Sequence, residues 1–74
     1  MLKIDEMFAF VAIEDDGEGL CAFKSGDHWL PMVGADMKRV EQLRPIAQDI
    51  ARMTGQEIRL IKFTARHEIE AIKP

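Results

Sequence analysis

Short apolar runs separated by acids and glycines divide the first part of the chain into strands. The first run, residues 7–13, has aromatic or β-branched side chains at both alternating sets of positions, which is typical of a central strand covered on both faces. Acids and glycines at 15–19 predict a turn, because glycine takes positive φ without steric cost. Residues 20–24 then predict the returning strand of a hairpin.

Two further segments predict strands at later positions. After a tight turn at 25–27, residues 28–33 predict a third strand, which Pro31 confines to an edge because proline cannot donate to a ladder. Residues 57–63 predict the final strand, with alternating apolar side chains on its two faces. Ile58 and Leu60 would lie on one face, and Ile61 and Phe63 on the other.

Between these strands, apolar residues recur at three- and four-residue steps and predict a helix with one apolar stripe, formed by Met37, Val40, Leu43, Ala47, Ile50 and Ala51. Asp36 is placed to cap its first turn, Arg52 suits its last turn, and Gly55 predicts a left-handed stop. Pro45 falls inside the stretch and removes a hydrogen bond, so we expect a kink near residues 41–44 or two abutting helices.

The predicted order is strand, strand, strand, helix, strand, which makes residues 1–74 a single α+β domain. The first three strands form an antiparallel meander, and a right-handed crossover through the helix places the fourth strand beside the first. The spatial order is then 3-2-1-4. Thr64 is placed to cap a last short helix in which Ala65, Ile69 and Ile72 line up.

One helix covers only one face of such a sheet, and an uncovered apolar face marks an interface. The chain is also small, and with Cys21 as its single cysteine it has no intrachain disulfide to stabilise it. Both arguments predict a homodimer. Tryptophan and methionine are enriched in interface cores, and the residues that we expect in the interface are Trp29, Leu30, Met32, Ile61 and Phe63.

Composition narrows the class of protein further. Ten basic and thirteen acidic residues give a net charge of −3. Residues 1–6 lack the apolar segment of a signal peptide, and the longest apolar run, at 7–13, is too short to span a bilayer. We therefore expect a cytoplasmic protein that does not insert into membranes. One cysteine and two distant histidines do not form a zinc set, and no cofactor is expected.

Three groups of residues carry side chains that are capable of binding or catalysis. The acidic turn at 14–19 offers oxygen ligands but lacks the spacing of a calcium loop, so a solvated hairpin tip is favoured. Cys21 with His28 or His67 could form a nucleophile and base, yet its apolar neighbours favour a buried thiol. A basic face for nucleic acid would draw on six residues but lacks stacking aromatics: Arg39, Arg44, Arg52, Arg59, Lys62 and Arg66.

The order of elements over roughly residues 7–63 resembles the first part of an RNase H-like fold, which HicB-type antitoxins use in reduced form. The acidic hairpin turn at 14–19 and the proline-containing segment 30–34 before the helix carry this resemblance. The stretches 32–36 and 43–47 are also similar to small uncharacterised proteins of bacterial and prophage genomes, a likeness that implies no activity.

The sequence thus favours a small non-enzymatic interaction or accessory module that acts as a homodimer and possesses no catalytic set. The alternative is an antitoxin-like or regulatory domain that contacts nucleic acid, directly or through a partner protein. An enzyme, such as a metal-independent hydrolase, ranks third.

Overall fold

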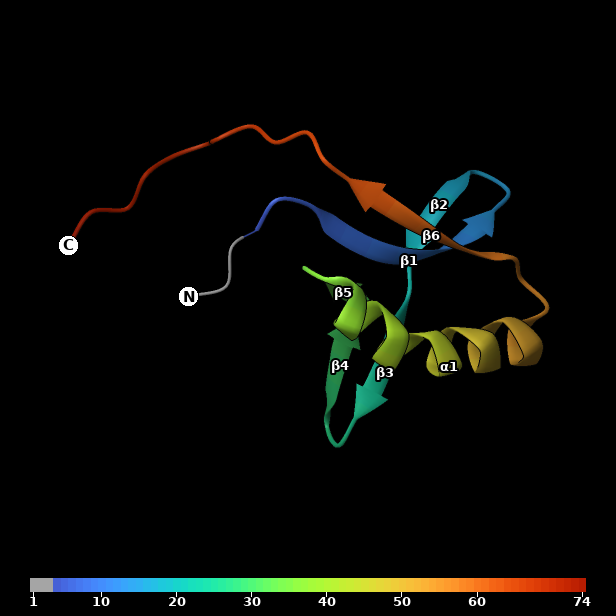
Figure 1. Cartoon of the computed structure of the whole chain (residues 1–74). Helices are drawn as coiled ribbons and strands as arrows, with labels where there is room; N and C mark the ends of the chain where they lie inside the picture. Colours follow the sequence, from blue (N-terminus) through green and yellow to red (C-terminus); the bar gives the residue numbers. More distant parts are fainter. Residues whose placement is uncertain (1–3) are drawn as a thin grey trace.

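The computed structural model describes residues 4–74. One helix lies against a small, strongly bent arrangement of strands, from which a hairpin and the C-terminal segment project (Figure 1). The elements are β1 (Met7–Glu14), β2 (Gly17–Leu20), β3 (Ala22–Ser25), β4 (His28–Pro31), β5 (Val33–Gly34), α1 (Met37–Thr54) and β6 (Ile58–Phe63).

Strand β1 is the centre of the main sheet. Along one edge it pairs antiparallel with β6, from Met7 opposite Phe63 to Ala12 opposite Ile58. Its other edge is shared by two short strands, with β2 on the C-terminal half and β5 on the N-terminal half. Because β5 and β6 are both antiparallel to β1, they run parallel to each other, and α1 forms the crossover between them.

Phe10 marks the point where the shared edge of β1 passes from β2 to β5. Its carbonyl accepts from the Cys21 amide and its amide donates to the Met32 carbonyl, both at 3.0 Å, while the Met32 amide donates to the Cys21 carbonyl at 2.9 Å. The segment between Cys21 and Met32 therefore does not pair with β1. It pairs with itself as the β3–β4 hairpin, which projects from the main sheet (Figure 1).

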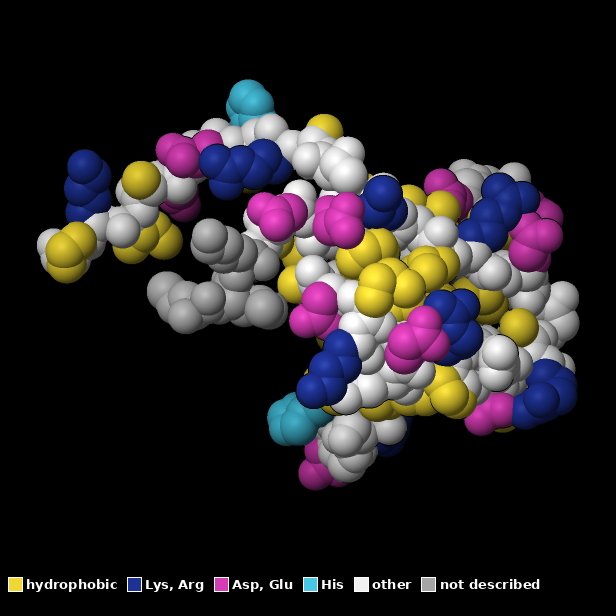
Figure 2. Space-filling model, in the orientation of Figure 1, with side chains coloured by type: hydrophobic (Ala, Val, Ile, Leu, Met, Phe, Trp, Pro, Cys, Tyr) yellow, Lys and Arg dark blue, Asp and Glu magenta, His cyan; other side chains and the backbone are white. Residues whose placement is uncertain are grey.

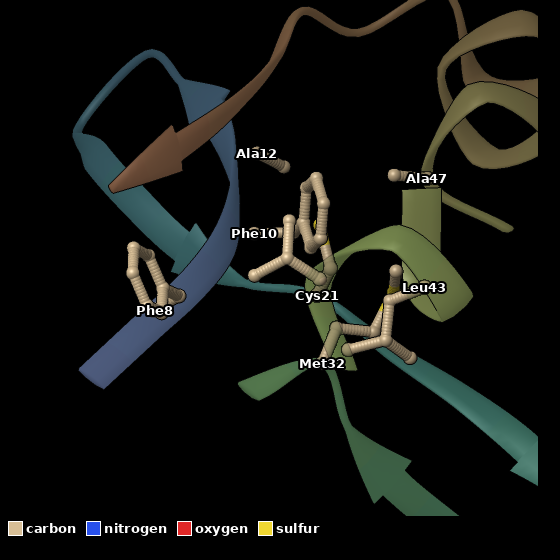
Figure 3. Packing of buried hydrophobic residues seen from close by; sticks show 8 residues of the cluster. Phe8, Phe10, Ala12, Cys21, Met32, Leu43 and Ala47 are labelled. Carbon is tan, nitrogen blue, oxygen red and sulfur yellow. The ribbon is translucent and has the colours of Figure 1, made fainter. Parts of the chain in front are cut away.

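The hydrophobic core lies between β1 and α1. In Figure 3, Phe10 points from β1 toward the helix, where Leu43 and Met32 lie close by. Met32 is completely buried, with 0% of its surface exposed. The buried cluster consists of Phe8, Phe10, Ala12, Cys21, Met32, Val40, Leu43 and Ala47.

Both ends of α1 carry the caps that the sequence predicts. The Asp36 side chain accepts a hydrogen bond from the Arg39 amide at 2.9 Å. Gly55 takes a left-handed conformation with φ 71°, and its amide donates to the Ala51 carbonyl at 2.9 Å. The helix runs unbroken through Pro45, so the alternative of two abutting helices is wrong.

The α+β class and the placement of the last strand beside the first are confirmed. The predicted order 3-2-1-4 needs one correction, because the third predicted strand does not stay at the far edge. Its end, β5, pairs with β1 itself, since β1 is long enough to hold β2 and β5 in tandem. The short helix expected after Thr64 does not form. Short helices depend on packing against a partner surface, and this segment stands away from the domain (Figure 1).

Replacing Asp36 with alanine is expected to lower the free energy of unfolding by about 1 kcal/mol. The change leaves the Arg39 amide without its side-chain acceptor. Urea unfolding followed by circular dichroism measures the effect. Asp36→Asn, which keeps an acceptor oxygen, serves as the control and should retain most of the stability. An equal loss in both variants would contradict the capping role.

Candidate interface on the open face of the sheet

The two faces of the main sheet differ in what covers them. Side chains alternate along a strand, and Phe8, Phe10 and Ala12 of β1 belong to the core beneath α1. Ala9 and Val11 therefore point to the opposite face. The strand register adds four neighbours to them, and we call this group the open face: Ala9, Val11, Leu20, Val33, Ile61 and Phe63.

The open face is a shallow apolar hollow of about 440 Å³. Small side chains of β1 form its floor, whereas Leu20 on one edge and Phe63 on the other rise around them. Leu20 is 55% exposed and Phe63 is 52% exposed, although both are large and apolar. The apolar face that a single helix leaves uncovered is thus a defined surface of the folded chain.

Two charged residues flank one end of the open face on opposite edges of the sheet. Leu20 and Arg59 lie on either side of Val11, and Glu18 lies two residues before Leu20 on β2. The Arg59 guanidinium binds the Glu57 carboxylate at 2.6 Å. One edge therefore carries an acid, and the other carries a guanidinium that is paired with Glu57 of its own chain.

The five residues predicted for an interface fall into three different environments. Ile61 and Phe63 lie on the open face, as the alternation in the last strand predicts. Trp29, which is 67% exposed, and Leu30 lie on the projecting β3–β4 hairpin. Met32 does not belong in the set, because it is fully buried in the core and offers no surface to another molecule.

Sequence reasoning missed Leu20 and Val33 as members of the open face. The signal was present in the alternation of the second and third strands. Leu20 and Val33 have the opposite parity to the core residues Cys21 and Met32, so they had to lie on the other face.

Cys21 does not have the environment of a nucleophile. It is buried in the core, and its pKa is raised because burial disfavours the thiolate and because the Glu14 carboxylate adds negative charge nearby. His28 and His67 are both exposed. Within residues 4–74 no hydrogen bond connects Cys21 to either histidine. This arrangement argues against the thiol–histidine pair considered from the sequence.

Alkylation of Cys21 by iodoacetamide is therefore expected to be slow in the folded protein and fast in urea, because only the thiolate reacts. The raised pKa also makes stability depend on pH. The folded state keeps the thiol proton to higher pH than the unfolded state, so this contribution is complete below the unfolded pKa and is lost as pH rises through the raised pKa of the folded state. Alkylation at equal rates in the folded and unfolded chain would contradict the buried thiol.

The acidic turn lies beside an open hollow of about 930 Å³ whose lining includes Asp15, Asp16, Glu57 and Arg59. Within the part of the chain that the structure describes, no three His, Cys, Asp or Glu side chains are grouped to hold a metal ion. The turn itself is short, because Glu14 already pairs with Gly17 across it. Its position fits the solvated hairpin tip predicted from the sequence.

The basic residues do not form an uninterrupted positive face. Four of the six considered for nucleic-acid binding are paired with acids: Arg44 with Glu41 at 3.0 Å, Arg52 with Asp49, Arg59 with Glu57 at 2.6 Å, and Lys62 with Glu6 at 3.8 Å. Figure 2 shows basic and acidic side chains next to one another over the visible face. Phosphate binding requires positive charge that is free to replace counterions, so this pairing argues against a nucleic-acid surface.

Within residues 4–74, no helix combines the length and the apolar character needed to cross a bilayer. No protein-family model, no curated protein and no solved structure matches the chain. The resemblance to HicB-type antitoxins and to small bacterial and prophage proteins therefore rests on the sequence pattern alone.

Proposed function

We propose that this chain is a non-enzymatic interaction module that acts as a homodimer, with the open face as its contact surface. The observation that carries the proposal is the exposure of Leu20 and Phe63 around an apolar hollow on the face opposite α1. Contiguous exposed apolar surface of this kind is characteristic of protein contacts.

The size of the exposed surface supports association with another molecule. The chain exposes 6309 Å², whereas a compact monomer of 8.4 kDa exposes about 4,600 Å². Its radius of gyration is 14.2 Å, compared with about 11 Å for a compact domain of this length. A standard protein interface covers about 800 Å² on each partner. The projecting β3–β4 hairpin and residues 64–74 contribute to the excess together with the open face (Figure 1).

The charges beside the open face favour a second copy as the occupant. A twofold axis that runs parallel to β1, between the open faces of two copies, places the β6 edge of one copy over the β2 edge of the other. Arg59 of one copy then lies over the β2 edge of the other, near Leu20 and Glu18. The same contact is repeated by symmetry, so each open face offers the other both an apolar surface and an opposite charge.

Sedimentation equilibrium over a range of protein concentrations tests the proposal. We expect the apparent mass to rise from about 8.4 kDa to at least twice that value as the concentration increases. High salt should weaken the association only slightly if the apolar hollow provides most of the affinity. A mass that stays at that of one chain up to millimolar concentration would overturn the homodimer.

A further inference from the structure

The outer edge of β6 and the segment that follows it form one long unpaired stretch of backbone. Within residues 4–74, β6 pairs only with β1, so its outer edge is free. Residues 64–74, which we call the arm, continue from β6 without a helix or a strand partner and run away from the domain (Figure 1). Ile69 is 92% exposed and Ile72 is 90% exposed, and Figure 2 shows hydrophobic side chains along the arm.

We propose that the arm of one copy pairs as an antiparallel strand with the outer edge of β6 in a second copy, and that the exchange is reciprocal about a twofold axis through Ala65. An exposed strand edge is a template for pairing with another chain. This contact uses the edge of the sheet, whereas the homodimer proposed above uses its open face. Both contacts can form at once, and molecules joined through both would form tetramers or longer assemblies.

The geometry of antiparallel pairing restricts where the twofold axis can lie. In an antiparallel pair, two directly opposite residues either both direct their N–H and C=O groups toward the partner strand or both direct them away from it. A residue can therefore lie opposite its own copy but not opposite a copy of its neighbour. A twofold axis through a residue is the axis that places this residue opposite its own copy. Axes through Arg59, Lys62 or Arg66 place a cation opposite itself, which destabilises the pair. An axis through Thr64 places Lys62 opposite Arg66, with the same result.

An axis through Ala65 pairs opposite charges instead. Lys62, which lies 3.8 Å from the Glu6 carboxylate within one copy, is then opposite Glu68 of the second copy. Glu57, which binds Arg59 within one copy, is opposite Lys73. Symmetry repeats each pair, which gives four opposite-charge pairs and no pair of like charges along the ladder. The axis itself falls on a small side chain, so the two strands meet there without steric conflict.

The same register also places the exposed isoleucines of the arm opposite isoleucines of β6 in the second copy. Ile69 lies opposite Ile61 of the second copy, and Ile72 lies opposite Ile58. On the helix side, the edge of β6 adjoins a cleft of about 220 Å³ between α1 and β6, whose apolar lining includes Ala47 and Ala51 together with Ile58 and Leu60. Ile72 would enter the mouth of this cleft, and Ile69 would extend the open face beyond Ile61.

Cysteine crosslinking of the full chain tests the arm contact. The Cβ atoms of directly opposite residues lie about 4.5–5.5 Å apart, close to the span of a disulfide. Mild oxidation of Ala65→Cys should therefore convert most chains into covalent dimers. Ile69→Cys alone should not crosslink, because two such residues would lie about 26 Å apart along the ladder. A mixture of Ile69→Cys and Ile61→Cys should crosslink only between the two variants. The parent chain with buried Cys21 controls for unrelated oxidation.

The outcomes separate this contact from the open-face homodimer. Crosslinking through residue 65 but not through residue 69 alone supports the arm contact and its register. An Ala65→Cys chain that stays uncrosslinked at concentrations where sedimentation shows dimers overturns the arm contact and leaves the open-face proposal standing. Equal crosslinking of the 65 and 69 variants overturns the register. A chain that is monomeric and uncrosslinked throughout overturns both proposals.

Discussion

Replacing Phe10 with alanine is expected to reduce the free energy of unfolding by about 3–5 kcal/mol. The side chain is almost completely buried between β1 and α1, and its removal leaves a cavity beside Leu43 and Met32 (Figure 3). A chain of this length has a total stability of about 4–11 kcal/mol, so this loss is a large fraction of the total and should move the unfolding midpoint to a much lower urea concentration. Urea unfolding followed by circular dichroism measures the change.

Phe63→Ala is the matched control for this experiment, because it makes the same chemical change on the opposite face of the same sheet. Phe63 is half exposed on the open face and lies outside the core cluster. In dilute protein, where chains do not associate, its loss should cost less than about 1 kcal/mol. Equal destabilisation by the two changes would show that the open face is part of the folding core.

Replacing Leu20 and Phe63 together with lysine is expected to weaken self-association at least about 100-fold. The change removes the two large side chains around the apolar hollow and places cations on the open face. In a twofold contact each substitution occurs twice, so four ammonium groups would have to be desolvated. Sedimentation equilibrium gives the dissociation constant of each variant.

The double variant Met37→Lys and Met53→Lys adds the same charge to exposed positions of α1, on the other side of the sheet. It should associate as the parent chain does. Circular dichroism must show that both double variants remain folded. If the helix variant weakens association as much as the open-face variant does, net charge rather than the open face controls association.

The elements with a clear period could be predicted from the sequence. Apolar residues at both parities identified β1 as the central strand, and the three- and four-residue steps with Asp36 and Gly55 defined α1. The uncovered apolar face could also be predicted, because one helix can cover only one of the two apolar faces of the sheet. These features depend on local periodicity, which a sequence displays directly.

The chain leaves the edge of β1 at Cys21 and returns to it at Met32. These two points could not be predicted, because the side-chain alternation continues through both residues and no turn residue marks them. This path of the chain arises from competition for one edge of β1, which is a tertiary effect. The error at Met32 has a different origin. The prediction for Met32 follows from the apolar composition of the run Trp29 to Met32, whereas in the structure Trp29 is exposed and Met32 lies in the core.

The arm shows how one pattern can serve two structures. Ala65, Ile69 and Ile72 match the spacing of a helix, but Ala65 and Ile69 also share one face of an extended strand that continues from Ile61 and Phe63. Without a surface to pack against, the helical alternative has no advantage.

The central claim is that a second molecule covers the open face, and methyl NMR with a soluble paramagnetic probe tests it most directly. At low concentration the probe should broaden the methyl signals of Leu20, Val33 and Ile61. At high concentration these signals should be protected, while the methyl of Met53 on α1 stays accessible to the probe. Open-face methyls that remain as accessible at high concentration as in dilute solution would contradict the claim.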